Sequence, residues 1–282
     1  MDSSICYLNG TWLPLSEARI SPLDRGFIFG DGVYEVVPVY RRKPFRLEQH
    51  LARLTRSLRE VRIAEPFDGA GWRAMIAALI ARGETEDQFV YLQVTRGVAK
   101  RDFAFPAGVA PTVFAMTSPF VRPGPELRDG GLRAVSRADE RWLRCDIKSV
   151  SLLAAVLARQ YAVENGAHEV VQFRDGFLTE GSASNIWVVK DGVVLGPPRD
   201  RYILEGIRYG LIEEMCGALG IEFVARPIAR AEVEAADELL LTAATREVLP
   251  IVSLDGRPVG SGRPGPIYQR LRAAYDAAIA AL

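Results

Sequence analysis

The sequence predicts an α+β protein of two domains. Segments with the helical period and segments with the strand period are mixed along its 282 residues without strict alternation, which favours α+β over α/β. Residues 118–125 hold three prolines in eight positions, a composition typical of a linker. The length suits two medium-sized domains. We therefore expect a small N-terminal α/β domain over residues 1–120 and a larger C-terminal domain over residues 121–282.

The N-terminal half predicts strands and two helices. Asn9-Gly10 is a strong hairpin signal between two short apolar segments. Apolar residues recur every three to four positions over residues 47–61, and a second helix is expected over residues 72–82. Residues 97–111 are expected to form a loop. The expected strands are residues 5–8, 11–13, 32–40, 88–95 and 111–117.

Beyond the proline-rich segment the pattern of strands and helices restarts. Asn165-Gly166 and Gly220 follow two of the helical segments, as is typical of helix ends. The expected helices are residues 152–164, 207–219 and 264–282. The expected strands are residues 132–135, 169–173, 186–189, 221–224 and 238–242.

Charge and composition exclude several classes of protein. The 35 lysines and arginines balance 35 acidic residues, which argues against a nucleic-acid partner. No apolar run approaches the roughly 20 residues that span a bilayer, and the N-terminus lacks the pattern of a secretory signal. Three cysteines without a C-x-x-C motif fit a reduced cytoplasm, where we expect the protein to act. Two histidines argue against a histidine metal site or a Ser-His-Asp triad, so we expect no metal.

Only four of the basic residues are lysines, which limits the candidates for chemistry that needs a primary amine. Lys43 and Lys190 lie in predicted turns and Lys100 in a basic loop, as expected of solvated surface charges. Lys148 lies among apolar residues just before a predicted helix. Partial burial disfavours the ammonium form, and a Schiff-base nucleophile needs the free amine. The alternative is an edge lysine whose ammonium reaches solvent.

Three further segments have the composition of ligand-binding loops. Gly206 opens a predicted helix, whose free N–H groups and dipole attract anions. Residues 242–247 form a second loop of small residues. Glu180 stands among glycine and small polar residues in 179–185, where a carboxylate can pair with a cationic ligand nitrogen. For each segment the alternative is an ordinary helix start or polar turn.

With these pieces in place, the chain resembles the branched-chain and D-amino-acid aminotransferase superfamily, which is fold type IV of the pyridoxal-phosphate enzymes. Residues 33–37 (Val-Tyr-Glu-Val-Val) and 141–149 (Arg-Trp-Leu-Arg-Cys-Asp-Ile-Lys-Ser) most resemble its D-amino-acid (D-alanine) aminotransferase branch. The resemblance runs nearly end to end. The segments that carry it are residues 24–37, 50–54, 93–97, 141–149, 179–185 and 203–207.

The resemblance implies that pyridoxal 5'-phosphate is bound in the cleft between the two domains, and it assigns residues to the cofactor ring. Lys148 becomes the internal aldimine lysine, and then the proton carrier between the amino acid's Cα and the cofactor's C4′. Glu180 matches the carboxylate beside the pyridine nitrogen, where its charge favours the protonated ring. Leu204 matches a residue that packs against the ring.

The resemblance also implies a set of contacts to the cofactor phosphate. Arg53 matches the arginine that binds it. Ile207 and Arg208 occupy the helix start whose backbone N–H groups meet it, and Ala244 matches another contact. Hydroxyl residues that are common in the family are replaced at Arg208 and Ala244. The backbone N–H donors are still present after those replacements, and the side chain of Arg208 or of the neighbouring Thr245 can replace the missing hydroxyl contacts.

Substrate binding is implied at two residues. Tyr34 and Arg101 match groups that hold the substrate α-carboxylate, with Arg101 reaching over from the partner subunit of a homodimer. The family pattern Arg-x-His reads Arg101-Asp-Phe103 here. The histidine that assists carboxylate binding is therefore absent, which affects substrate affinity and range more than the reaction.

The activity implied is transamination from a D-amino acid, such as D-alanine, to a 2-oxo acid, pyruvate or 2-oxoglutarate. Three alternatives stay open. One is a transaminase for branched-chain L-amino acids or (R)-amines, and another is a lyase of the aminodeoxychorismate type, which releases pyruvate without an amino acceptor. The third is a non-catalytic member, against which the presence of both Lys148 and Glu180 argues.

Overall fold

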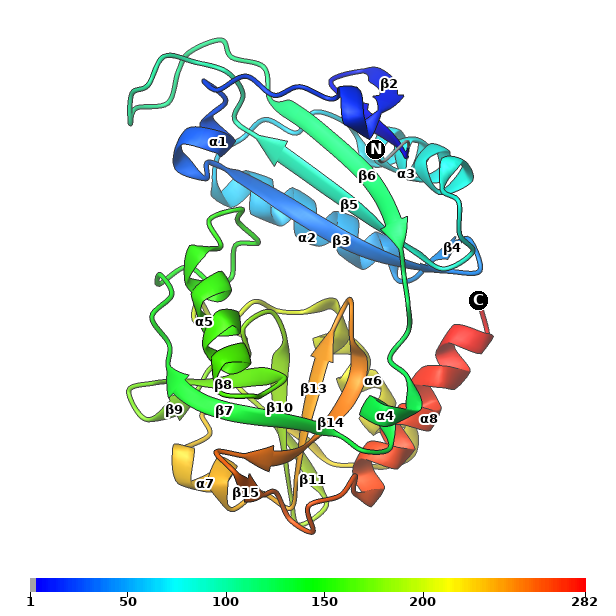
Figure 1. Cartoon of the computed structure of the whole chain (residues 1–282), viewed down its shortest axis with the longest axis vertical. Helices are drawn as coiled ribbons and strands as arrows, with labels where there is room; N and C mark the ends of the chain where they lie inside the picture. Colours follow the sequence, from blue (N-terminus) through cyan, green and yellow to red (C-terminus); the bar gives the residue numbers. More distant parts are fainter. Residues whose placement is uncertain (1–3) are drawn as a thin grey trace. The chain divides into compact units, whose positions relative to one another are not determined.

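The computed structural model describes residues 4–282, and the chain divides into two compact units (Figure 1). The first unit comprises the chain up to Val121 together with Ile147–Leu152 and Leu282, and the second comprises Arg122–Asp146 and Leu153–Ala281. The main division lies close to the boundary expected near residue 120. Ile147–Leu152 differs from expectation: this segment, with Lys148, packs in the first unit and not in the C-terminal domain that was expected to carry it.

The first unit is built on a six-stranded antiparallel sheet. Its N-terminal hairpin turns at Asn9 and Gly10, with φ of 48° and 92°, so the predicted turn is confirmed. The strands are β1 (Ile5–Leu8), β2 (Thr11–Pro14), β3 (Gly32–Tyr40), β4 (Lys43–Pro44), β5 (Gln88–Thr95) and β6 (Thr112–Pro119). They run in the order β2-β1-β6-β5-β3-β4.

Two helices, α2 (Leu47–Glu60) and α3 (Gly69–Arg82), lie against this sheet, and Figure 1 shows both behind the strands. Val33, Val37 and Val39 alternate along β3 and meet the apolar sides of both helices in one core. This is the pattern expected when every second strand residue faces a buried layer. Asp68 caps α3 by accepting from the Gly71 N–H at 2.7 Å. The short helices are η1 (Leu15–Glu17) and α1 (Arg25–Phe29).

The second unit is built on a nine-stranded mixed sheet. The strands are β7 (Leu132–Ala138), β8 (Glu169–Arg174), β9 (Phe177–Leu178), β10 (Asn185–Lys190), β11 (Val193–Gly196), β12 (Phe223–Ala225), β13 (Glu238–Ala243), β14 (Glu247–Leu254) and β15 (Arg257–Pro258). Their order is β12-β11-β10-β13-β14-β7-β8-β9, and β15 pairs with β14. The pairs β7–β8, β7–β14 and β11–β12 are parallel. The carboxyl ends of β7 and β8 therefore lie at one edge.

The three long helices of the second unit lie close to their predicted positions, whereas its two short helices were not predicted. The helix α6 ends at Gly220, whose φ of 63° is the left-handed conformation expected of a helix-ending glycine. It packs against α8 and against β13. The helices are α4 (Pro125–Arg128), α5 (Leu153–Glu164), α6 (Ile207–Leu219), α7 (Arg230–Glu234) and α8 (Pro266–Ala280). None of these, and no helix elsewhere in residues 4–282, is long and apolar enough to cross a bilayer.

Candidate active site

Lys148 lies in a segment that is hydrogen-bonded to the edge of the first unit's sheet. Its carbonyl accepts from the Tyr34 N–H at 3.0 Å, and the Val150 N–H donates to the Gly32 carbonyl at 3.0 Å. The Lys148 N–H donates to Ser57 Oγ on α2 at 3.3 Å. The backbone is thus fixed by both β3 and α2. This attachment explains why Lys148 packs with the first unit.

The Lys148 amine faces an aromatic ring. Its Nζ lies 4.1 Å from the centroid of the Tyr34 ring, within the range of a cation–π contact. Tyr34 stacks on Tyr91 with their centroids 5.8 Å apart, and the Tyr91 hydroxyl donates to Gln93 Oε1 at 2.6 Å. Burial raises the pKa of Tyr91 to about 12, so this hydroxyl keeps its proton at neutral pH. The structure thus brings Lys148 and Tyr34 together on one face.

A buried ion cluster lies on the other face of β3. Successive strand residues point to opposite faces, so Glu35 faces α2. It accepts from Arg53 Nε at 2.7 Å and Nη2 at 2.9 Å, and its Oε2 lies 2.8 Å from His50 Nδ1. Burial by itself raises the pKa of Glu35, but Arg53 and His50 more than offset it, so that pKa lies well below its ordinary value. Arg53, the expected phosphate ligand, is thereby fixed with its charge balanced by Glu35.

In the second unit, Glu180 is a buried carboxylate surrounded by hydrogen-bond donors. The Leu204 N–H lies 3.2 Å and 3.1 Å from its two oxygens, and Asn185 Nδ2 donates to Oε2 at 3.2 Å. Arg141 forms an ion pair with Oε1. Burial raises the pKa of Glu180, and the Arg141 guanidinium opposes that effect. The net effect is a raised pKa, so a cation bound beside Glu180 would favour its charged form.

Asn185 links Glu180 to the loop that precedes α6. Besides Glu180, its Nδ2 donates to the Leu204 carbonyl at 2.9 Å. A Cβ at Gly206 would lie 2.2 Å from Asn185 Oδ1, so a side chain there would force Asn185 away. Glycine is required here by this close approach, which complements the anion-site interpretation drawn from the sequence.

The start of α6 has the form of an anion site. Gly206 is the cap residue and provides no side-chain hydrogen bond, so the helix dipole and the first backbone N–H groups, at Ile207 and Arg208, are not covered by a capping side chain. The Arg208 side chain is 2% exposed and its Nη2 donates to the Tyr275 hydroxyl at 3.2 Å. The Arg208 guanidinium therefore points into the core of the second unit.

Ala244 and Thr245 lie in the turn between β13 and β14. The turn ends at Glu247, which has a left-handed φ of 58° and a fully buried side chain. Arg122 Nε and Arg272 Nη1 each lie 2.7 Å from its carboxylate. A buried ion pair with Arg272 and a partly exposed one with Arg122 thus hold a backbone conformation that non-glycine residues rarely adopt, and they fix one end of the expected phosphate loop.

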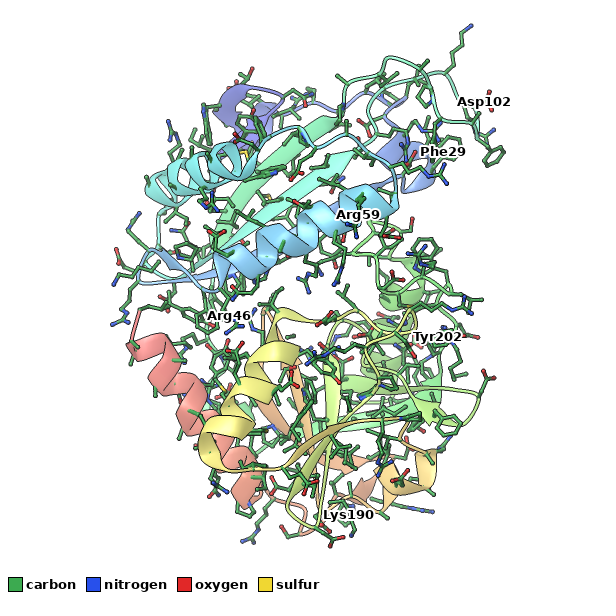
Figure 2. All side chains as sticks on the ribbon, turned by 180° about the vertical axis from the view of Figure 1, so that it is seen from behind. Phe29, Arg46, Arg59, Asp102, Lys190 and Tyr202 are labelled. Carbon is green, nitrogen blue, oxygen red and sulfur yellow. The ribbon has the colours of Figure 1, made fainter. Side chains whose placement is uncertain are left out.

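Arg101 belongs to the loop between β5 and β6, whose backbone is clamped by Arg25. The Arg25 side chain is 4% exposed, and its Nη1 donates to the Asp102 carbonyl at 2.5 Å and the Ala104 carbonyl at 3.3 Å. Asp31 holds Arg25 by accepting from its Nε at 2.8 Å. Figure 2 labels Asp102 in this loop, near Phe29 at the end of α1.

The Arg101 side chain lies beside two aromatic rings that contact each other. Its guanidinium carbon lies 5.5 Å from the ring centroid of Phe29 and 5.7 Å from that of Phe103, and the two rings are 5.3 Å apart. Phe103 is 77% exposed. In place of the histidine expected from the resemblance, this loop therefore presents the Phe103 ring beside Arg101, while Phe29 of α1 contacts both Arg101 and Arg25.

The predicted site residues thus fall into two groups within the described chain. In the first unit the structure pairs Lys148 with Tyr34 and fixes Arg53, whereas Arg101 lies in its own loop. In the second unit Glu180 contacts Leu204, three residues before the first residue of α6, whose start has no capping side chain. Each group fits a part of pyridoxal phosphate: the amine of Lys148 in the first unit suits its aldehyde, and in the second unit Glu180 suits its ring nitrogen and the start of α6 suits its phosphate.

Sequence reasoning missed the residues that hold the predicted ones in place. Glu35, His50 and Arg141 lie inside the segments that carry the resemblance, but nothing local marks them as partners of Arg53 and Glu180. Arg141 and Glu180 are far apart in sequence, so their pairing depends on the folded chain.

Comparison with known proteins places this arrangement in a family. The model of the family "Amino-transferase class IV" matches residues 32–254. This chain belongs to the class IV aminotransferases. The fold type IV assignment from the sequence is thereby confirmed.

Similar class IV relatives include two D-alanine aminotransferases. That of Bacillus licheniformis is 39% identical over 96% of this chain and 95% of its own length. That of Staphylococcus aureus (strain COL) is 38% identical over 96% of both chains.

Solved structures with the same fold include branched-chain aminotransferases. One of them, solved with pyridoxamine 5'-phosphate, has a TM-score of 0.93 at 26% identity, covering 98% of this chain and 94% of its own. The Thermoproteus uzoniensis enzyme with norvaline has a TM-score of 0.90 at 27% identity, covering 99% and 95%.

Proposed function

We propose that this protein is a pyridoxal-phosphate-dependent transaminase that moves the amino group of a D-amino acid, such as D-alanine, to a 2-oxo acid, pyruvate or 2-oxoglutarate. The observation that carries the proposal is the identity of 39% and 38% to D-alanine aminotransferases over nearly the whole chain. The contact of Lys148 with Tyr34 and the donors around Glu180 support it. The buried free cysteines are consistent with action in the cytoplasm.

Two residues act on the cofactor's reactive end and ring. When bound, pyridoxal phosphate supplies an electron sink for the substrate Cα. Lys148 holds the cofactor through its amine and moves the proton between the substrate Cα and C4′. Glu180 holds the proton on the ring nitrogen, because a nearby carboxylate favours the charged ring. Leu204, whose N–H donates to Glu180, packs against the ring.

The cofactor phosphate is proposed to bind Arg53, the start of α6 and the turn before β14. Ile207 and Arg208 supply backbone N–H groups, since the Arg208 side chain is directed to Tyr275. Ala244 supplies a backbone contact, and Thr245 supplies the hydroxyl that Ala244 lacks. The two ion pairs of the buried Glu247 carboxylate keep this turn in place.

Tyr34 and Arg101 are proposed to hold the substrate α-carboxylate, with Arg101 reaching the site of a partner copy in a homodimer. Exposed apolar side chains on α5 support the association of two copies of this chain. One side of α5 exposes apolar side chains at helical spacing, and exposed apolar rows are typical of interfaces. They are Leu153, Val156, Leu157 and Tyr161, with 72%, 59%, 56% and 38% exposed.

A coupled assay of the purified protein loaded with pyridoxal phosphate tests this function. D-alanine, D-glutamate, L-leucine and (R)-1-phenylethylamine are compared as donors, with pyruvate or 2-oxoglutarate as acceptor. We expect turnover with the D-amino acids and with an acceptor only. Pyruvate released without an acceptor would indicate a lyase instead.

A branched-chain L-amino-acid or (R)-amine transaminase is the second candidate. The solved structures with the same fold are branched-chain enzymes, and the loop that carries Arg101 has Phe103 where the resemblance expects histidine. Preferred turnover of L-leucine or (R)-1-phenylethylamine over D-alanine in the same assay would favour this candidate.

A further inference from the structure

Asp139 and Arg174 stand side by side at the carboxyl ends of two parallel strands. In the β7–β8 pair, Ala138 lies opposite Phe173, and the Asp139 N–H donates to the Phe173 carbonyl at 2.8 Å. Asp139 follows β7 and Arg174 is the last residue of β8. Their side chains form an ion pair, with Arg174 Nη2 3.1 Å from Asp139 Oδ2. The parallel pairing thus produces a charge pair that no local pattern shows.

Asp139 also holds Arg141, the residue that pairs with Glu180. The Asp139 side chain is fully buried. Its Oδ1 accepts from the Arg141 N–H at 3.0 Å and from Nε at 2.9 Å, and its Oδ2 accepts from Nη2 at 2.8 Å. Arg141 Nη2 also donates to the carbonyl of Tyr202, which is labelled in Figure 2, at 3.1 Å. One edge of the guanidinium therefore faces Asp139, and Nη1 faces Glu180.

The charges in this cluster balance. Asp139 and Glu180 are opposed by Arg141 and Arg174, and Cys145 is the other titratable group coupled to them. Burial raises the pKa of the Cys145 thiol to about 11, so it is neutral. The pKa of Glu180 is raised mainly by burial, and the negative charge of Asp139 raises it further. Because Arg141 is shared between two carboxylates, it does not neutralise Glu180 alone.

Resting on the function proposed above, we propose that Asp139 is a positioning residue which, by holding Arg141, sets the charge that Glu180 presents to the ring nitrogen of the cofactor. With Asp139 in place, part of the Arg141 charge is compensated by Asp139, so Arg141 compensates less of the Glu180 charge that faces the ring. Without the Asp139 charge, Arg141 and Arg174 face one carboxylate. The two guanidinium groups then compensate the charge of Glu180 more fully, the field at the ring nitrogen becomes more positive, and the ring nitrogen loses its proton more readily.

Two variants that are expected to change the pKa of the ring nitrogen in opposite directions test this role. Asp139→Asn keeps the size of the side chain and removes its charge, so the pKa of the ring nitrogen falls. Arg174→Gln removes a competing cation, which leaves Asp139 to compensate Arg141 more fully, so the same pKa rises. Each pKa unit changes the ratio of protonated to deprotonated ring about tenfold. Asp191→Asn, in the exposed β10–β11 turn, is the matched control.

The readout is the ¹⁵N chemical shift of ¹⁵N-labelled pyridoxal phosphate bound to each variant, followed against pH. Steady-state kinetics with D-alanine accompany it. For Asp139→Asn we expect a lower titration midpoint and a kcat about tenfold lower, with an unchanged KM because the substrate carboxylate is bound elsewhere. Asp139→Glu, which restores the charge, is expected to recover part of both.

The possible results distinguish failure of the Asp139 role from failure of the proposed transaminase function. Unchanged midpoints in both variants, or midpoints shifted in the same direction, would overturn the role of Asp139 while transamination by the unaltered protein stands. If Asp139→Asn does not fold, the midpoint of Arg174→Gln decides: a rise supports the role, and no rise contradicts it. If the unaltered protein binds the labelled cofactor without transaminating any donor, the proposed function fails and this inference fails with it.

Discussion

Lys148 differs from the other three lysines in how its backbone and amine are held. Lys43, Lys100 and Lys190 are exposed, and Lys190 forms a surface ion pair with Asp237, so their interpretation as surface charges is confirmed. Lys148 is hydrogen-bonded to β3 and α2, and its amine faces the Tyr34 ring. Such a fixed amine suits repeated proton transfer at one carbon, because each transfer requires the same geometry.

Replacing Lys148 tests the central residue. Lys148→Ala is expected to lower kcat by at least the ~10²–10⁴-fold that a positioned proton carrier contributes. It is also expected to abolish the visible absorbance band of the covalently held cofactor. Lys190→Ala is the control, since its amine is solvated, and it is expected to retain both properties. Normal turnover by Lys148→Ala would show that another group carries the proton.

Glu35 is expected to contribute to stability rather than to the reaction. It is fully buried and compensates Arg53, so Glu35→Gln leaves that guanidinium without its counter-charge, at a cost of about 3–5 kcal/mol. The folded-state pKa of Glu35 is depressed. Its contribution is therefore present above the ordinary glutamate pKa of about 4.3 and is lost as the pH falls toward the depressed value.

Urea unfolding at pH 7 and pH 3 measures this contribution. The unaltered protein is expected to lose more stability between the two pH values than Glu35→Gln does. Glu48→Gln, at an exposed ion pair with Arg73, is the control and is expected to change little. Equal losses in the unaltered protein and in Glu35→Gln would contradict the assignment.

Among the elements, the long helices and the hairpins were predicted well, whereas the short helices and several strands were not. The periodicity over residues 47–61 predicted α2 almost to its ends, because an amphipathic helix is encoded by neighbouring residues. The strands β11 and β14 were not predicted. The latter contains Pro250, which is opposite Leu240, and its register shifts between Ile251 and Ser253. Proline lacks the N–H of a ladder bond, so only pairing with β13 and β7 reveals this strand.

The loop between β5 and β6 depends on Arg25, which donates to two of its carbonyls. In Arg25→Met we expect the loop to become mobile, because the buried clamp is lost. Trypsin should then cut faster after Lys100 and Arg101, and KM for D-alanine should rise more than kcat falls. The exposed Arg19→Met, which loses only local backbone contacts, is the control. Unchanged cleavage and KM would show that the clamp is not needed.

At the scale of the whole molecule, the proposed homodimer predicts complementation between inactive variants. Lys148→Ala and Arg101→Ala are mixed after mild unfolding and refolded together, then assayed at low D-alanine concentration. If Arg101 serves the partner's site, each mixed dimer contains one site with both residues, and random pairing restores about a quarter of the unaltered activity. If Arg101 serves its own subunit, the mixture stays as inactive as its components. Sedimentation checks that dimers form.

The sequence by itself determined the features that neighbouring residues encode. These are the helical periods, the turn at Asn9-Gly10, the glycine at the end of α6, and the motifs that single out Lys148 and Glu180. Each depends on spacing or backbone conformation within a few residues, so it is visible without the fold. The family followed from the same motifs.

Only the tertiary structure decided how these residues are held. Lys148 packs in the first unit because its backbone bonds to β3 and α2, although it lies beyond the division near residue 121. Glu180 meets Arg141 because strands far apart in the sequence pair in one sheet, and Asp139 reaches Arg141 from the end of β7. Ion pairs between distant residues leave no periodic signal, since their partners are chosen by chain topology and by the need to compensate buried charge.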